Sequence, residues 1–180
     1  MHDRSTRQSP LWMGVLVAAA VLFSFALACG MPFAALGALA ALTLTPRDAA
    51  LLAGLGWVAN QAIGFGFLGY PFDAKTLAWG VALGLSALAA VGAAVAALHR
   101  VPVNGIVFRS ALSFFAAWVA QQGTVFAASV LLGGTATAFA PSVVWFILWT
   151  NALAFAVLVV TQALGAFAGL ARPALGQPAQ

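Results

Sequence analysis

Charged residues are few and widely spaced in this chain, and their spacing most constrains how it can fold. No Asp, Glu, Lys or Arg lies between Arg7 and Arg47, or between Arg109 and Arg172. Only 6% of all residues are charged and 64% are hydrophobic, whereas a soluble domain usually has about 25% charged residues. We therefore predict an integral membrane protein.

Charges, prolines and glycines divide the chain into six apolar segments. A single helix over 11–45 would be about 50 Å long, whereas the hydrocarbon core is only about 30 Å thick, so we expect a turn at 29–32. Lipid offers no partner to backbone polar groups, and the alternation typical of a β-barrel is absent, so the segments should be helices. The prediction is an all-α membrane protein, a compact bundle of six transmembrane helices over residues 11–30, 31–45, 49–69, 76–98, 110–132 and 142–170.

The basic residues predict how this bundle is oriented. With six helices and the N-terminus in the cytoplasm, the outer side carries only Lys75, and the inner side carries Arg4, Arg7, Arg47, Arg100, Arg109 and Arg172. This asymmetry follows the positive-inside rule, and it explains the basic pI without a nucleic-acid partner. We expect cytoplasmic tails over 1–10 and 173–180, and one transmembrane domain over 11–172. The segment 11–30 is interpreted as a retained helix rather than a cleaved signal peptide.

Two related stretches place amide side chains in the middle of apolar segments. WVANQ (residues 57–61) matches WVAQQ (residues 118–122) at an offset of 61 positions. Both segments run from inside to outside in the predicted topology, so the amide pairs should lie at similar depth. The match suggests a parallel three-plus-three repeat.

These amides have two interpretations. In the first, they hydrogen-bond across helices and hold the bundle together, at about 0.6 kcal/mol per bond on average. In the second, they form a polar, uncharged pocket walled by indoles, suited to a flat or amide-bearing neutral ligand. The candidate substrate-binding residues are Trp57, Asn60, Gln61, Trp118, Gln121, Gln122, Trp149 and Asn151. The glycine pairs Gly80/Gly84 and Gly165/Gly169 are expected to let helices pack closely.

The sequence lacks the residues that several classes of function need. No ionisable residue lies deep in a segment, as proton-coupled transport normally requires. There is no Walker motif for ATP hydrolysis, no spaced metal-ligand set, and no catalytic triad. We therefore expect neither an enzyme nor a cofactor. The single cysteine, Cys29, excludes an internal disulfide, and it is best interpreted as a small packed residue rather than a ligand of a soft metal centre.

The layout of the chain resembles the substrate-binding S-component of energy-coupling factor (ECF) vitamin transporters. The stretch that carries the resemblance is MPFAALGALAALTLTPRDAALLAGLGWVANQ, residues 31–61: a short helix of small residues, a Pro-Arg turn, then a longer helix. The resemblance implies a multi-pass protein of the bacterial cytoplasmic membrane that binds a vitamin from outside. It also implies a transmembrane coupling subunit and ATPase subunits as partners. Alanines spaced by four, which such proteins use on their first helix for coupling, are incomplete here.

The sequence therefore favours a membrane-embedded binding and uptake protein for a small neutral or zwitterionic nutrient, a vitamin or its precursor. Two alternatives stay open. One is a standalone channel or carrier for a small uncharged solute. The other is a structural membrane subunit without a ligand.

Overall fold

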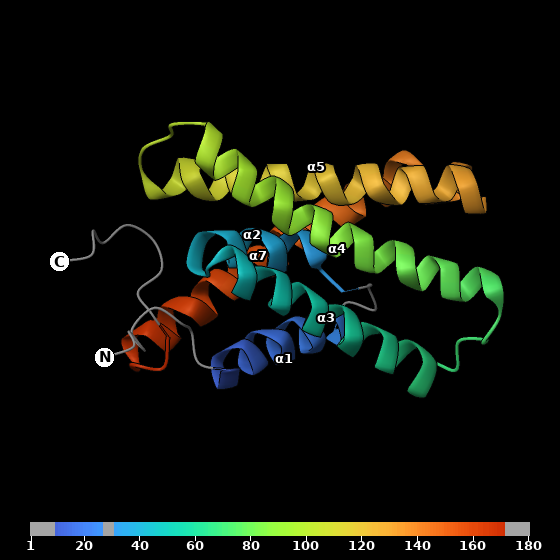
Figure 1. The fold of residues 1–180 in the computed structure, drawn as a ribbon, viewed down its shortest axis with the longest axis horizontal. Helices are drawn as coiled ribbons and strands as arrows, with labels where there is room; N and C mark the ends of the chain where they lie inside the picture. The colour runs from blue at the N-terminus through green and yellow to red at the C-terminus, as the bar shows by residue number, and fades with distance from the viewer. Residues whose placement is uncertain (1–9, 27–30, 172–180) are drawn as a thin grey trace.

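The computed structural model describes residues 10–26 and 31–171, and this part of the chain is helical without any strand. Its helices are α1 (Pro10–Ala26), α2 (Phe33–Thr43), α3 (Pro46–Gly66), α4 (Ala74–Arg100), α5 (Ile106–Leu132), α6 (Thr135–Ala138) and α7 (Pro141–Phe167). Figure 1 shows the long helices side by side in a bundle. The predicted all-α fold is confirmed.

Four helices, α3, α4, α5 and α7, are long and apolar enough to cross a membrane, which indicates a membrane protein. The other two predicted segments correspond to the shorter apolar helices α1 and α2. The four-residue α6 was not predicted. The count of six membrane spans and the orientation of the chain ends stay predictions, and the turn at 29–32 lies partly outside the described residues.

Helix α2 lies at the centre of the bundle. Every residue over 31–40 is buried, and α2 packs against α3, α4, α5 and α7 (Figure 1). Its 11 residues reach about 17 Å at 1.5 Å per residue, roughly half of a hydrocarbon core. Helix α2 therefore begins inside the bundle, and its N-terminus is surrounded by protein.

The helix ends carry the polar caps that the sequence provides. Thr45 precedes α3, and its hydroxyl both accepts from the Asp48 N–H at 3.2 Å and donates to Asp48 Oδ2 at 2.9 Å. Asp73 precedes α4, and its Oδ1 accepts from the Thr76 N–H at 2.8 Å. This bond lowers the pKa of Asp73 by stabilising the carboxylate. Both acids therefore have local roles at helix starts.

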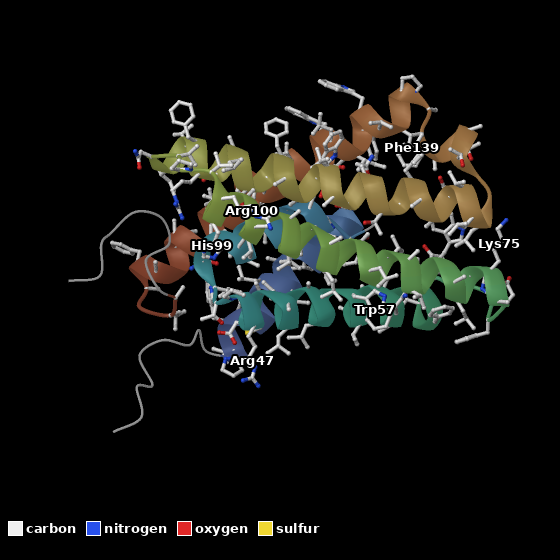
Figure 2. The ribbon with its side chains drawn as sticks, turned by 45° about the horizontal axis from the view of Figure 1, so that its top comes forward. Arg47, Trp57, Lys75, His99, Arg100 and Phe139 are labelled. Carbon is white, nitrogen blue, oxygen red and sulfur yellow. The ribbon has the colours of Figure 1, made fainter. Side chains whose placement is uncertain are left out.

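Most basic residues of the described ranges gather toward one end of the bundle. Figure 2 shows Arg47, His99 and Arg100 toward one end and Lys75 at the other. Arg109 lies in the first turn of α5, next to the short connection from α4, and so belongs to the first end. His99, one residue beyond the predicted segment 76–98, lies in the last turn of α4. Helices α3 and α5 both begin at the end with the arginines and are therefore parallel.

The start of α1 and the end of α7 are joined by a buried contact. Trp12 Nε1 donates to Gln162 Oε1 at 2.7 Å, and both side chains are buried. The Trp12 ring covers Gly165 so closely that a Cβ there would collide with it. Gly165 therefore allows the close packing expected of it, whereas Gly169 lies beyond α7 with a φ of 71°.

Replacing Gly165 with alanine should displace the Trp12 ring and weaken its hydrogen bond to Gln162. We expect the protein to lose about 1–3 kcal/mol of stability, as overpacked cores do. Thermal unfolding in detergent measures this loss. The matched control is Gly14→Ala in α1, where no atom lies within 4 Å of the new Cβ. Equal melting temperatures for the two variants would contradict the close contact between the Trp12 ring and Gly165.

Candidate ligand-binding cavity

A cavity of about 190 Å³ lies beside the start of α2, and four of the predicted amides line it. They come from three helices: Asn60 from α3, Gln121 and Gln122 from α5, and Asn151 from α7. Met31 and Phe33 line it from the α2 side, and apolar side chains of α4, α5 and α7 complete the lining. Two amide-bearing stretches far apart in the sequence thus meet around one space.

The cavity lies close to the middle of α5 and α7, whereas on α3 it lies nearer the end of the helix, since Asn60 is six residues before Gly66. Gln121 lies 11 residues before the end of α5, and Asn151 lies 10 residues after the start of α7. At 1.5 Å per residue, both are about 15–17 Å from those ends, roughly half of a 30 Å hydrocarbon core. Polar groups at this depth have no bulk water to pair with, so their hydrogen-bond partners must come from the protein, trapped water or a ligand.

Asn151 has its partners within the protein. Its Oδ1 accepts from the Ala35 N–H at 3.4 Å, and its Nδ2 donates to the Ile147 carbonyl at 2.9 Å. Ala35 lies in the first turn of α2, where N–H groups have no carbonyl of their own helix to bond. Asn151 therefore links α7 to the start of α2, which is a structural role at the edge of the cavity.

Gln121, Gln122 and Asn60 differ from Asn151. The Gln121 side chain is only 7% exposed, and its Oε1 has no hydrogen-bond partner in the described part of the chain. No hydrogen bond joins the side chain of Asn60 or Gln122 to any described residue. A buried amide oxygen without a partner typically costs about 1–3 kcal/mol. The cavity thus holds unused donors and acceptors.

Trp57 and Gln61 lie outside this cavity. The Trp57 Nε1 donates to the Gly80 carbonyl at 2.8 Å, and its ring rests on Gly84, where a Cβ would be 3.0 Å away. The Gln61 amide lies against Gly80 in the same way. The glycine pair Gly80/Gly84 therefore lets α3 side chains approach α4, as expected of small residues.

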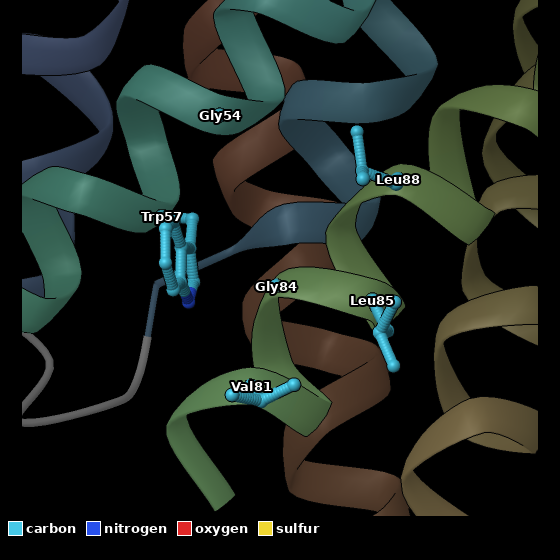
Figure 3. A pocket seen from close by; sticks show the side chains of 6 residues that line it. All are labelled: Gly54, Trp57, Val81, Gly84, Leu85 and Leu88. Carbon is cyan, nitrogen blue, oxygen red and sulfur yellow. The ribbon is translucent and has the colours of Figure 1, made fainter. Parts of the chain in front are cut away.

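Trp57 instead borders a second, apolar hollow of about 220 Å³ between α3 and α4. Figure 3 shows the indole beside Gly84, with Val81, Leu85 and Leu88 along α4. Val81, Leu85 and Leu88 are exposed. This hollow faces outward and lacks the amides, so it does not extend the amide-lined cavity.

The other two predicted tryptophans are also absent from the cavity lining. Trp118 packs against a cluster of alanines from α2, α4 and α5, and its Nε1 has no partner among the described residues. Trp149 is 61% exposed on α7, a position that suits contact with lipid. Cys29 lies outside the described residues.

Met31 and Phe33 line the cavity although sequence reasoning did not select them. Pro32 indicated that a helix begins close to these two residues, because proline interrupts a helix. Nothing in the sequence indicated that this helix, α2, starts in the middle of the bundle. No charged residue lines the cavity, and the described residues contain no cluster of His, Cys, Asp or Glu that could hold a metal. Comparison with known proteins found no protein family, no curated protein and no solved structure that matches this chain.

Proposed function

We propose that this chain is a membrane-embedded binding and uptake protein for a small neutral or zwitterionic nutrient, a vitamin or vitamin precursor. The supporting observation is the amide-lined cavity, one of whose lining residues, Gln121, has a buried Oε1 without a partner in the described part of the chain. Asn60, Gln121 and Gln122 would hydrogen-bond the nutrient, and Asn151 would hold the wall against which it lies.

The arrangement of partners supports binding over a purely structural role. The amides that hold helices together do so through visible bonds, as Gln162 does with Trp12 and Asn151 with Ala35. Asn60 of α3 and the two glutamines of α5 instead border a space, whose volume equals that of roughly six water molecules at 30 Å³ each. A nutrient that replaced such waters would satisfy the amides and gain contact with the apolar walls.

The remaining parts of the proposal rest on the resemblance to ECF S-components. It places the protein in the bacterial cytoplasmic membrane, with a transmembrane coupling subunit and ATPase subunits as partners. The absence of a Walker motif is consistent with an energy source outside this chain. The resemblance itself rests on the sequence of residues 31–61. In the described part of the chain, the short α2 is followed by the longer α3, which begins at Pro46 and Arg47.

The test is the thermal stability of the purified full chain against a panel of vitamins and their precursors. A nutrient at 100 times its Kd should stabilise the folded state by about 2.7 kcal/mol. Gln122→Ala should abolish this shift. Gln61→Ala is the matched control, because Gln61 packs on Gly80 outside the cavity, and it should keep the shift.

Two results would overturn parts of this proposal. If Gln122→Ala keeps the full shift, the nutrient binds somewhere other than the amide-lined cavity. If no compound shifts the unmutated protein, the binding function itself is wrong. Uptake into liposomes that contain this chain alone would identify a carrier that needs no ATPase subunits.

A further inference from the structure

The cavity has a hydrogen-bond donating side formed by the start of α2. Phe33, the first residue of α2, lines the cavity with Met31. First-turn N–H groups carry the partial positive charge of a helix N-terminus and favour an acceptor. The Ala35 N–H reaches its acceptor, Asn151 Oδ1, only at 3.4 Å, beyond the usual 2.7–3.2 Å range. The Phe33 N–H donates to the Met31 carbonyl at 2.8 Å, so what this side offers a ligand is the long Ala35 bond and the positive end of the α2 dipole, which suit a carbonyl group.

A separate observation shows that the ligand must supply a hydrogen-bond donor. Gln121 lines the same cavity from α5, its side chain is more than nine-tenths buried, and its Oε1 lacks a partner among the described residues. An amide oxygen accepts hydrogen bonds and donates none. A ligand that satisfies both α2 and Gln121 must therefore carry an acceptor and a donor.

Size and charge narrow the ligand further. An apolar cavity of about 150 Å³ holds one benzene molecule, so about 190 Å³ has room for one ring and a small polar group. None of the described residues that line the cavity is charged, and an ion without a counter-charge is costly at mid-membrane depth. The ligand should therefore be neutral.

We infer that the cavity binds a neutral, single-ring compound whose polar group places a carbonyl beside an N–H, as in a carboxamide, a lactam or a cyclic urea. The carbonyl lies toward the start of α2, and the N–H donates to Gln121 Oε1. This inference rests on the proposed function and narrows its substrate class. It excludes zwitterions, which the sequence alone left open.

Four ring compounds of nearly equal size test the inference. Benzamide offers a neutral carbonyl and N–H, acetophenone a neutral carbonyl alone, benzoate a negative charge, and benzylamine a positive charge at neutral pH. Their binding to the full chain in nanodiscs is measured by isothermal titration calorimetry. Benzamide should bind at least about tenfold more tightly than acetophenone, because acetophenone leaves Gln121 Oε1 unpaired. The two charged compounds should bind more weakly than either.

Variants of Gln121 test whether the difference in affinity between benzamide and acetophenone depends on Gln121 Oε1. Gln121→Leu should bring benzamide down to the affinity of acetophenone, and Gln121→Met serves if the leucine variant does not fold. Gln61→Leu, outside the cavity, should preserve the tenfold difference.

The possible failures can be told apart. Equal binding of benzamide and acetophenone, or tightest binding of a charged compound, would overturn the ligand class while leaving a binding protein. No binding of any of the four would also overturn the ligand class. The proposed function falls with it only if the vitamin panel gives no stabilisation either.

Discussion

Replacing Gly37 with leucine should prevent α2 from packing on α4 and cost about 3 kcal/mol or more of stability. A Cβ at Gly37 would lie 3.2 Å from the Val91 backbone nitrogen and 3.3 Å from the Ala90 carbonyl carbon. Backbone atoms of a packed helix cannot rotate away as a side chain can. The further carbons of leucine would therefore push the helices apart.

The control is Gly92→Leu, at the residue next to Val91 but on the exposed side of α4. No atom lies within 4 Å of a Cβ at Gly92, so the new side chain has open space. Leucine also favours the helix over glycine, so this variant should unfold at the same temperature as the unmutated protein or slightly higher. Circular dichroism in detergent follows both transitions. If Gly37→Leu unfolds at the same temperature as Gly92→Leu, then α2 and α4 are not in close contact.

The helices themselves could be predicted from the sequence because lipid leaves the backbone few options. The predicted segments 76–98 and 110–132 differ from α4 and α5 by a few residues at their ends, because charged residues delimit them. The position of α2 could not be predicted, because its residues are almost uniformly small and apolar and show no preferred face. Only tertiary packing places such a helix at the centre of a bundle.

The candidate site was predictable only in part, because residue type reveals the amides but does not reveal how their helices are rotated. Amides are conspicuous in an apolar segment, so Asn60, Gln121, Gln122 and Asn151 could be selected by residue type alone. Helix rotation decides which side chains share a space. Asn60 and Gln61 are neighbours about 100° apart on α3, and only Asn60 lines the cavity. The matching sequences around Trp57 and Trp118 likewise give different surroundings, Gly84 for one and the alanine cluster for the other.

Substitutions of two cavity amides should change stability in opposite directions when no ligand is present. Gln121→Leu removes a buried oxygen that has no partner among the described residues and puts apolar carbons in its place, so the ligand-free protein should gain up to about 1–3 kcal/mol. Asn151→Leu removes the acceptor of the Ala35 N–H and leaves that donor unpaired. This variant should lose about 1–3 kcal/mol.

Chemical unfolding of both variants in the same detergent, without added ligand, measures the two differences. A residue kept for binding often costs stability in the unbound protein, whereas removing one partner of a buried hydrogen bond between helices lowers stability. A loss of stability in Gln121→Leu similar to that in Asn151→Leu would mean that Gln121 also joins helices. A gain of stability in Gln121→Leu, together with a fall of its benzamide affinity to that of acetophenone, would separate the two roles within one cavity: Gln121 for the ligand, Asn151 for the start of α2.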